Sequence, residues 1–215
     1  MTSDFVSGVS LRQFRTGSFF RHYQQVFLSL HGRHLRGLVV EIGAEAQYGH
    51  ERLFPGADRY VATNISGRAD VLLDATAAPL GTGTVDVVVC VSVVEHIRQI
   101  ELAFAEMARV LRPGGTLILT VPFCFPVHDR QDYWRVTHQN PMALLADAFE
   151  PVDITRLGGK ISTVAQLLQR PVGRWDRRHL PMKVLGMVFS LLLGRFDQPD
   201  DSPLGFGVVA RRRGA

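Results

Sequence analysis

The sequence contains 215 residues, 46% of them hydrophobic and 20% charged. A chain of this length buries enough apolar surface for one domain and is too short for two full ones, so we expect a single domain. The formal charge of +4 is scattered along the chain, apart from basic clusters at 174–183 and 211–213. This distribution gives little support to a polyanionic partner such as nucleic acid.

Cysteine usage and hydropathy argue against disulfide-rich, secreted and membrane-spanning proteins. Cys90 and Cys124 lie within apolar runs and show no disulfide or Cys/His ligand spacing, so we predict no disulfide framework and no metal site. The first residues lack the basic and apolar stretches of a secretory signal. The longest apolar run, 184–194, is about half of the roughly 20 residues that a spanning helix needs. We expect a cytoplasmic protein without a transmembrane helix.

The first predicted element is a helix. Ser18 is a suitable N-cap, and apolar residues from 19 to 30 recur at helical spacing. We therefore assign residues 1–36 to an N-terminal helical segment. Five β-rich runs follow, at 38–42, 60–63, 71–73, 85–91 and 116–121. Several of these runs are apolar on both faces, as the buried strands of a parallel sheet require.

Helices separate and follow the later strands. Residues 102–111 have helical periodicity, and the Arg-Pro-Gly-Gly sequence at 112–115 ends this helix. Asn140 and Pro141 predict the start of a helix that runs to 149. The remaining predicted elements are strands at 152–154 and 206–210 and helices at 161–170 and 182–193. Alternating strands and helices predict an α/β protein with a doubly wound sheet, in which ligands bind beyond the carboxyl ends of the strands.

Two segments near the predicted strand ends resemble a known family. Residues 39–44 read Val-Val-Glu-Ile-Gly-Ala and resemble the first motif of class I S-adenosylmethionine-dependent methyltransferases, in which an acidic residue precedes a glycine turn. Asp74 and Ala75, followed by Pro79 and Leu80, resemble the D-A-x-x-L-P stretch of that family with its last two residues inverted.

Two longer segments extend the resemblance. Residues 85–97 are similar to the family's F-D-h-V-h-x-x-x-V-L-E-H-h, where h is apolar, and residues 106–117 to its E-h-x-R-V-L-R-P-G-G-x-L. The resemblance implies a Rossmann-like, mostly parallel seven-stranded sheet with helices on both faces and an antiparallel last strand. It also implies a methyltransferase domain over 37–215, with a helical insertion at about 158–200, and S-adenosylmethionine as the cofactor.

The glycine turn explains how such a chain would hold the cofactor. Glycine lets the backbone approach the ligand, and the carboxylate of Glu41 can accept hydrogen bonds from the ammonium group of the cofactor. The Asp74 side chain would meet the adenine amino group. The predicted cofactor-binding residues are Glu41, Gly43, Ala44, Glu45, Tyr48, Asn64, Ile65, Asp74, Ala75, Val91, Ser92 and His96.

Two features depart from the family pattern. Glu45 and Tyr48 occupy the loop where the family has further glycines. Either Glu45 favours a sulfonium cation and Tyr48 offers it an aromatic face, or they are a solvated carboxylate and a packed ring. Asn64 stands where a carboxylate normally accepts hydrogen bonds from the ribose hydroxyls, and an amide there lacks charge assistance. These departures leave open a non-catalytic relative.

A narrower likeness follows the fifth strand. Residues 121–137 resemble the V-P-F…H…P-x-D-Y-x-R-x-T segment of the type 11 methyltransferase group, often found in polysaccharide and natural-product biosynthesis, with Gln131 in place of proline. The resemblance implies a small-molecule or sugar acceptor. The predicted acceptor-binding residues are Asp132, Tyr133, Trp134 and Arg135. Trp134 is either a wall on which a sugar stacks or a core residue.

Two of the eight histidines follow the fourth and fifth strands, where cofactor and acceptor should meet. Methylation of a hydroxyl needs a general base, and histidine is the side chain best matched to pH 7. We predict His128 as the catalytic base of an O-methyltransferase, the alternative being a loop histidine bonded only to backbone. His96 is expected to cap the following helix or to contact the cofactor.

Other functions compete with this interpretation. A nucleic-acid methyltransferase that modifies adenine would carry an Asn/Asp-Pro-Pro-Tyr/Phe segment, whereas residues 90–93 read Cys-Val-Ser-Val. A nicotinamide-dependent oxidoreductase would carry a G-x-G-x-x-G fingerprint, which is missing. A relative that binds the cofactor without methylating remains open. Residues 174–193 join basic residues to an apolar helix, which predicts a lid or core helix, a contact with a second subunit, or a peripheral membrane contact.

Overall fold

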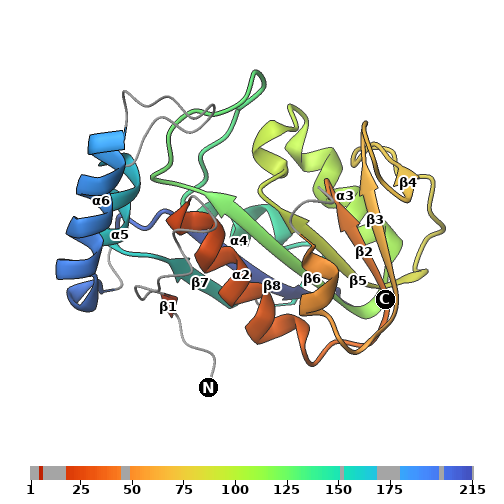
Figure 1. The fold of residues 1–215 in the computed structure, drawn as a ribbon. Coiled ribbons are helices and arrows are strands. Elements are labelled where there is room, and N and C mark those ends of the chain that lie inside the picture. The colour runs from red at the N-terminus through yellow and green to blue at the C-terminus, as the bar shows by residue number, and fades with distance from the viewer. Residues whose placement is uncertain are drawn as a thin grey trace.

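The structure is a computed structural model that describes residues 5–6, 18–44, 49–150, 153–168, 180–198 and 201–214. In these residues one sheet is covered by helices on both faces (Figure 1). Helix α2 lies on one face and helices α3 and α4 on the other, while α5 and α6 pack together beside the end of β7. This is the layered α/β architecture that the sequence predicts.

The described elements agree with the predicted ones in type and order, but β6 begins at Leu111, five residues before the predicted start at 116, and α4 ends at Leu145, four residues before the predicted end at 149. The strands are β1 Phe5–Val6, β2 Gly37–Ile42, β3 Ala57–Asn64, β4 Val71–Leu72, β5 Val85–Val91, β6 Leu111–Pro122, β7 Asp153–Leu157 and β8 Gly205–Arg211. The helices are α2 Phe19–Gly32, α3 Ile100–Val110, α4 Gln139–Leu145, α5 Lys160–Leu168 and α6 Leu180–Leu193. Short 3-10 turns are η1 His50–Leu53, η2 Val94–His96 and η4 Gly194–Phe196.

The strands stand in the order β1-β7-β8-β6-β5-β2-β3-β4. Strand β8 is antiparallel to both β6 and β7, and all other neighbours are parallel. The predicted sheet with an antiparallel last strand is confirmed. Strand β1 adds an eighth strand beside β7, which the sequence does not predict because two residues carry no periodic signal. The direction of winding reverses between β2 and β5, so the ligand crevice is expected at the carboxyl ends of these two strands.

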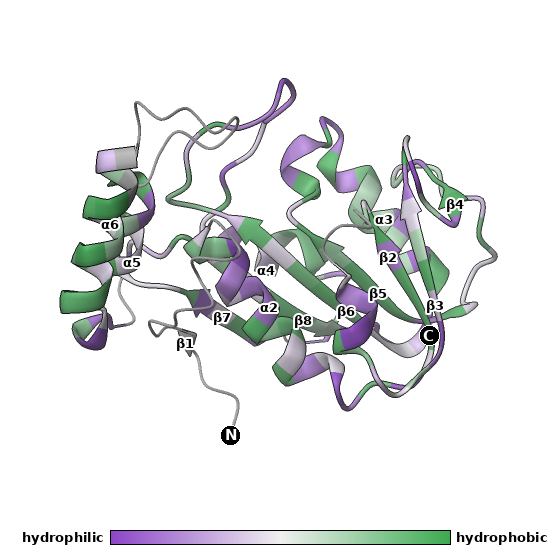
Figure 2. Cartoon of the chain, viewed as in Figure 1, coloured by the Kyte–Doolittle hydropathy of each residue, from purple (hydrophilic) through white to green (hydrophobic). Residues whose placement is uncertain are grey.

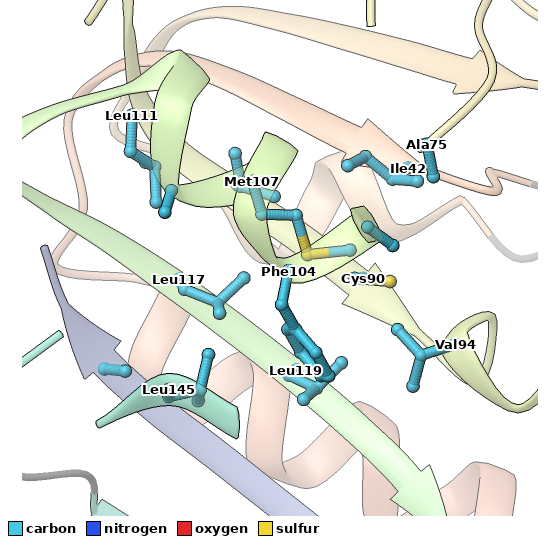
Figure 3. Packing of buried hydrophobic residues seen from close by; sticks show 14 of the residues in the cluster. Ile42, Ala75, Cys90, Val94, Phe104, Met107, Leu111, Leu117, Leu119 and Leu145 are labelled. Carbon is cyan, nitrogen blue, oxygen red and sulfur yellow. The ribbon is translucent and has the colours of Figure 1, made fainter. Parts of the chain in front are cut away.

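One hydrophobic core lies between the sheet and α3 and α4. Figure 3 shows Phe104 and Met107 of α3 beside Leu117 and Leu119 of β6. Met107 is completely buried, as are the two leucines. These contacts fix the position of the loop between β5 and α3, which carries part of the candidate site.

Helix α2 forms the core of the other face. Its N-cap is Ser18, as predicted, and the hydroxyl of Ser18 accepts a hydrogen bond from the N–H of Arg21 at 3.4 Å. The N–H of Phe19 donates to Oε1 of Gln166 on α5 at 2.8 Å, which satisfies a helix-end donor that has no partner within its own helix. Apolar side chains of α2 pack against those of the central strands: Phe19, Phe20, Tyr23, Phe27 and Leu28 against Val39, Val87, Val89 and Ile118. Helix α2 thus shares its core with the sheet. The predicted division of the chain at residue 36 stays a prediction.

Helix α6 turns its small residues inward and its large apolar residues outward. Gly186 and Ser190 are buried. The exposed apolar side chains of α6 are Met182, Val184, Leu185, Val188, Leu191, Leu192 and Leu193. Figure 2 shows that most of α6 is hydrophobic, and because these side chains are exposed, the described part of 174–193 does not form the expected core helix. The basic residues at 174–179 lie outside the described residues. Among the helices that the structure describes, none is both long and apolar enough to cross a bilayer.

Candidate functional site

The site begins at the turn after β2. Gly43 has a φ of +73°, and a Cβ added to it would overlap the side chain of Val93 in the loop after β5. Glycine is therefore required both by the backbone conformation and by the approach of the two loops. The next residue, Ala44, is buried, and its N–H donates to the carbonyl of Thr63 at the end of β3 at 2.7 Å. The turn that the sequence assigns to the cofactor is thus held by the two neighbouring strand ends.

Asn64 secures the same turn. Its amide nitrogen donates to the carbonyl of Ala44 at 2.9 Å. A carboxylate cannot donate such a bond, which gives a physical reason for the amide at this position. The side-chain oxygen of Asn64 remains an acceptor, the role predicted for it toward a ribose hydroxyl. Ile65, which follows, is exposed.

Glu41 is buried at the end of β2 and has a partner for each carboxylate oxygen. Oε1 lies 2.6 Å from Nδ1 of His50, and Oε2 accepts a hydrogen bond from the hydroxyl of Tyr60 at 2.7 Å. Burial and the adjacent carboxylate raise the pKa of Tyr60, so its hydroxyl stays protonated as a donor. Glu41 therefore joins β2 to β3 and η1. A carboxylate has further acceptor positions, and the predicted contact with an ammonium group stays a prediction.

The predicted adenine contact lies on the loop after β4. Asp74 is exposed, and its Oδ1 accepts hydrogen bonds from the backbone N–H and the hydroxyl of Thr76, at 2.8 and 2.7 Å. These bonds lower the pKa of Asp74, so it remains an anion. Ala75 beside it is buried. Glu45 and Tyr48 lie outside the described residues, and their predicted roles stay predictions.

The loop after β5 contains a strained residue. Ser92 has a φ of +51°, which is uncommon outside glycine, and follows the half-buried Val91. Its conformation is held by a hydrogen bond from its N–H to the carbonyl of Thr120 at 3.0 Å and by one from Nε2 of Gln24 to its hydroxyl at 2.6 Å. Nε2 of Gln24, a buried residue of α2, also donates to the hydroxyl of Thr120 at 2.9 Å. Such strain persists where surrounding contacts enforce it, and it is concentrated at functional sites.

Arg135 organises the loop after β6. It donates to the carbonyls of Phe125 and Pro126, both at 3.1 Å, and forms a two-point ion pair with Asp132 in which one N···O distance is 2.6 Å. Arg135 therefore folds this loop back on itself, and its predicted contact with an acceptor stays a prediction. Burial opposes the ionisation of Asp132, but the bonds from Arg135 and from the N–H of His128 outweigh it and lower the pKa of Asp132 to about 2.

His128 lies beside that carboxylate. The backbone N–H of His128 donates to Oδ2 of Asp132 at 2.9 Å, and ring Nδ1 lies 3.2 Å from the same oxygen without forming a hydrogen bond among the described residues. The ring packs edge-on against the rings of His96 and Phe125, with centroids 5.0 and 5.3 Å away. Burial lowers the pKa of His128 despite the opposite effect of Asp132, so the ring is neutral at pH 7 and keeps a lone pair.

The loops after β5 and β6 are joined by backbone contacts. The N–H of Tyr133 donates to the carbonyl of Glu95 at 2.8 Å, and the indole N–H of Trp134 donates to the carbonyl of Ile97 at 2.8 Å. His96 is hydrogen-bonded through Nδ1 to the carbonyl of Gln131. Trp134 is 37% exposed, so it is not a core residue, and its ring and that of Tyr133 are both accessible from solvent.

Glu95 is the most unusual residue of the site. It is 1% exposed, and neither of its carboxylate oxygens has a hydrogen-bond partner in the part of the chain that the structure describes. The backbone of Glu95 and the hydroxyl of Ser92 favour the anion, but the effect of burial on the pKa is larger. Burial raises the pKa of Glu95 to about 8, and the nearby carboxylate of Asp132 adds to the increase.

Comparison with known proteins gives a match to one family model. The family model described as "Methyltransferase domain" matches residues 44–119, which run from the turn after β2 to strand β6. The matched segment contains β3, β4, β5 and most of β6, and the complete sheet has the strand order of class I methyltransferases. Residues 44–119 are therefore similar to the methyltransferase domain family, and the chain has the class I S-adenosylmethionine-dependent methyltransferase fold. No curated protein matches the sequence.

Solved structures share this methyltransferase fold. Phosphoethanolamine N-methyltransferase 2 of Haemonchus contortus, in complex with S-adenosyl-L-methionine, is 14% identical over 89% of this chain with a TM-score of 0.59, and the chain spans about half (52%) of its length. A putative methyltransferase of Haloferax volcanii, in complex with the Trm112 activator, is 15% identical with a TM-score of 0.63, covering 94% of this chain and 92% of that one. The [4+2]-cyclase SpnF is 17% identical with a TM-score of 0.58, covering 89% and 81%. At such identities the likeness concerns the fold alone.

The methyltransferase site contains residues that sequence reasoning missed. Gln24, His50 and Tyr60 hold the strand ends through side-chain hydrogen bonds, and Gln24 does so from a helix 68 residues away from Ser92. Nothing local to these residues marks them, because each partner lies elsewhere in the sequence. The sequence gives one indication of Glu95, because it immediately precedes His96 in the family motif. Its complete burial is not visible in the sequence, since it depends on the loop after β6.

Proposed function

We propose that this methyltransferase transfers the methyl group of S-adenosylmethionine to a hydroxyl of a small molecule or a glycan. The observation that carries the proposal is the His128–Asp132 pair. It lies on the loop after β6, in contact with the loop after β5, and it holds a neutral imidazole at the edge of the sheet where this family binds its ligands.

The residues at the ends of β2 and β3 fit the cofactor. Gly43 leaves no side chain on the inner surface of its turn, and Asn64 keeps one acceptor oxygen after its amide has bonded to Ala44. Asp74 remains ionised beside Ala75, as the predicted adenine contact requires. We assign Gly43, Ala44, Asn64 and Asp74 to cofactor binding. Glu41, which joins β2 to β3 and η1, holds the turn in place.

The proposed role of His128 is proton removal. When bound, S-adenosylmethionine supplies a methyl group on a sulfonium centre, which is a good leaving group. His128 accepts the proton of the acceptor hydroxyl as the oxygen forms its bond to the methyl carbon, and the electrons of the broken carbon–sulfur bond remain on sulfur. Asp132 stabilises the resulting imidazolium, because its low pKa keeps it anionic.

The surrounding residues would position the acceptor. Tyr133 and Trp134 present exposed aromatic rings on the same loop as His128, and a sugar ring can stack on such surfaces. Arg135 contributes indirectly, because it holds Asp132 and the loop carbonyls and so fixes the orientation of His128. A control substitution at a second histidine, outside this loop, separates an effect on catalysis from an effect on folding.

Replacing His128 tests this function. In His128→Gln, which keeps a polar side chain but no base, kcat should fall about 10²- to 10⁴-fold, while the affinity for S-adenosylhomocysteine stays unchanged. The control is His34→Gln, since His34 is an exposed histidine beyond the end of α2. An unchanged kcat in His128→Gln, measured on an identified hydroxyl acceptor, would contradict the assignment of the base.

A second candidate function is a non-methylating use of the same cofactor. SpnF, which has the same fold, is a [4+2]-cyclase by name, so this fold accommodates reactions other than methylation. Conversion of S-adenosylmethionine to S-adenosylhomocysteine in the presence of candidate acceptors separates the two. Product formation without release of S-adenosylhomocysteine would favour the non-methylating function.

The exposed surface of α6 supports a peripheral contact with an anionic membrane. Its large apolar side chains face solvent, and basic residues accompany the helix in the sequence at Arg174, Arg177, Arg178 and Lys183. Co-sedimentation with vesicles that contain anionic lipid, but not with neutral vesicles, would support it. A wild-type protein that is a dimer in solution, together with a Leu185→Ser variant that is a monomer, would instead assign this surface to a contact with a second copy of the chain.

A further inference from the structure

Three potential metal ligands converge where the loops after β5 and β6 meet. A carboxylate oxygen of Glu95 and one ring nitrogen each of His96 and His128 all lie within 4.8 Å of one another. Glu95 and His96 belong to η2, whereas His128 is contributed by the loop after β6. The cluster is therefore made by tertiary structure and not by a local sequence motif.

The buried carboxylate of Glu95 gives an independent reason to look for a cation. Both of its oxygens are buried, and they lack hydrogen-bond partners among the described residues. The nearest guanidinium, that of Arg135, is already engaged by Asp132. Burying an unpaired polar group costs free energy, and a buried charge is normally paired or bound to a metal ion. A cation between Glu95 and the two histidines would provide the missing partner.

The groups beside Nδ1 of each histidine suit both residues to be ligands: His96 has a hydrogen bond there, and His128 has a nearby carboxylate. Nδ1 of His96 must donate to the carbonyl of Gln131, so Nε2 carries the lone pair, and Nε2 lies 4.0 Å from Oε1 of Glu95. His128 has a carboxylate beside Nδ1, since Oδ2 of Asp132 lies 3.2 Å away. A backbone carbonyl or a carboxylate on the second ring nitrogen is the usual arrangement around metal-bound histidines.

We propose that Glu95, His96 and His128 form a binding site for a divalent transition-metal ion such as Zn²⁺. Two histidines and one carboxylate match the nitrogen and oxygen ligands that Zn²⁺ accepts, with open positions left for water or a substrate oxygen. At bond lengths of about 2.0–2.2 Å, tetrahedral ligand atoms lie about 3.4 Å apart. The ligand atoms of this cluster would have to move closer together by about 1 Å, which side-chain rotation provides.

Metal binding and proton transfer compete for His128. The nitrogen that accepts the proton of the acceptor must have a free lone pair, and a bound Zn²⁺ would occupy it. Binding of Zn²⁺ to this site therefore inhibits methyl transfer. This consequence rests on the proposed function, whereas the metal site itself does not.

Direct metal-binding measurements test the site without any acceptor or cofactor. The full chain is treated with a chelator, dialysed, and titrated with Co²⁺ and then Zn²⁺, with visible absorption and metal analysis as readouts. We expect one Zn²⁺ per chain and Co²⁺ bands of a low-coordinate nitrogen and oxygen site. Because loss of an outer-sphere partner alone costs about 10- to 100-fold in affinity, Glu95→Gln and His96→Gln should weaken binding by about 100-fold or more.

Matched controls make the outcome decisive. His34→Gln removes an exposed histidine outside the cluster and should bind Zn²⁺ as the wild type does. Thermal unfolding of each variant without metal shows whether it is folded. If Glu95→Gln is folded but does not bind Zn²⁺, Glu95→Asp, which keeps the negative charge, should retain part of the affinity for Zn²⁺. Wild-type protein that binds no Zn²⁺, or Glu95→Gln that binds it with unchanged affinity, would overturn the proposal.

The two proposals fail in different ways. An active methyltransferase that binds no Zn²⁺ would overturn the metal site and leave the proposed function intact. A protein that binds Zn²⁺ through Glu95, His96 and His128 but releases no S-adenosylhomocysteine would overturn the function and leave the site. An active enzyme that binds Zn²⁺ at this site without inhibition would refute the competition for His128.

Discussion

The buried carboxylate of Glu95 makes a quantitative prediction about stability in metal-free protein. Its pKa is raised from 4.5 to about 8, mainly because burial disfavours the anion. The unfolded chain therefore releases this proton at a lower pH than the folded protein does. The contribution of protonated Glu95 to the free energy of unfolding is fully present below pH 4.5, and it is lost as the pH rises to the folded-state pKa of about 8.

The size of the effect follows from the pKa difference. At about 1.36 kcal/mol per pKa unit, the free energy of unfolding should be about 3 to 4 kcal/mol lower at pH 8 than at pH 5 because of this one group. For a chain of this size, 1 kcal/mol corresponds to about 2–4 °C in Tm, so the shift is on the order of 10 °C. In Glu95→Gln, which resembles the protonated acid, this part of the pH dependence should vanish.

Urea denaturation at pH 5, 6, 7 and 8, in the presence of a chelator, measures the prediction. Other groups also titrate in this range, so the quantity to compare is the difference between wild type and Glu95→Gln at each pH. We expect the stability of the variant relative to that of the wild type to rise by about 3 to 4 kcal/mol between pH 5 and pH 8. Parallel stability curves would refute the conclusion that Glu95 is buried without a partner.

Three further variants test other parts of the structure. Gly43→Ala should abolish measurable binding of S-adenosylhomocysteine in calorimetry, since a side chain there overlaps Val93 and the φ of +73° is unfavourable for alanine; unchanged affinity would refute the close contact of these loops. Met107→Ala should destabilise the protein by about 2–5 kcal/mol in urea denaturation, because Met107 is completely buried against the sheet, and a loss below about 1 kcal/mol would contradict that packing. Asp132→Asn should lower both Tm and kcat, because Arg135 loses its ion pair and His128 its anionic partner; a normal kcat would show that the pair does not act in catalysis.

Much of the fold can be read from the sequence because the signals are local. The buried strands β5 and β6 are nearly continuous apolar runs, and the cap at Ser18 marks the beginning of α2 within one residue. Helix α4 begins at Gln139, one residue before the predicted cap at Asn140, and helix ends commonly differ by that much. Strand β1 was missed because pairing with β7, and not its own pattern, makes it a strand.

The site is less predictable because its contacts join distant segments. The motif placed Gly43, Ser92 and His96 at strand ends, but no sequence pattern shows that Arg135 binds its own loop or that Trp134 is accessible to solvent. The absence of a Cys/His motif led to the prediction of no metal site, whereas the Glu95–His96–His128 cluster is assembled only when two loops meet. Cytoplasmic location and a biosynthetic role stay predictions.

Calorimetric titration of the purified chain with S-adenosylhomocysteine, with NAD as the comparison, tests the central claim most directly. The account predicts saturable binding of one S-adenosylhomocysteine per chain, a rise in Tm with ligand concentration, and no heat with NAD. Absence of heat and of any Tm shift with S-adenosylhomocysteine at saturating concentration would contradict it.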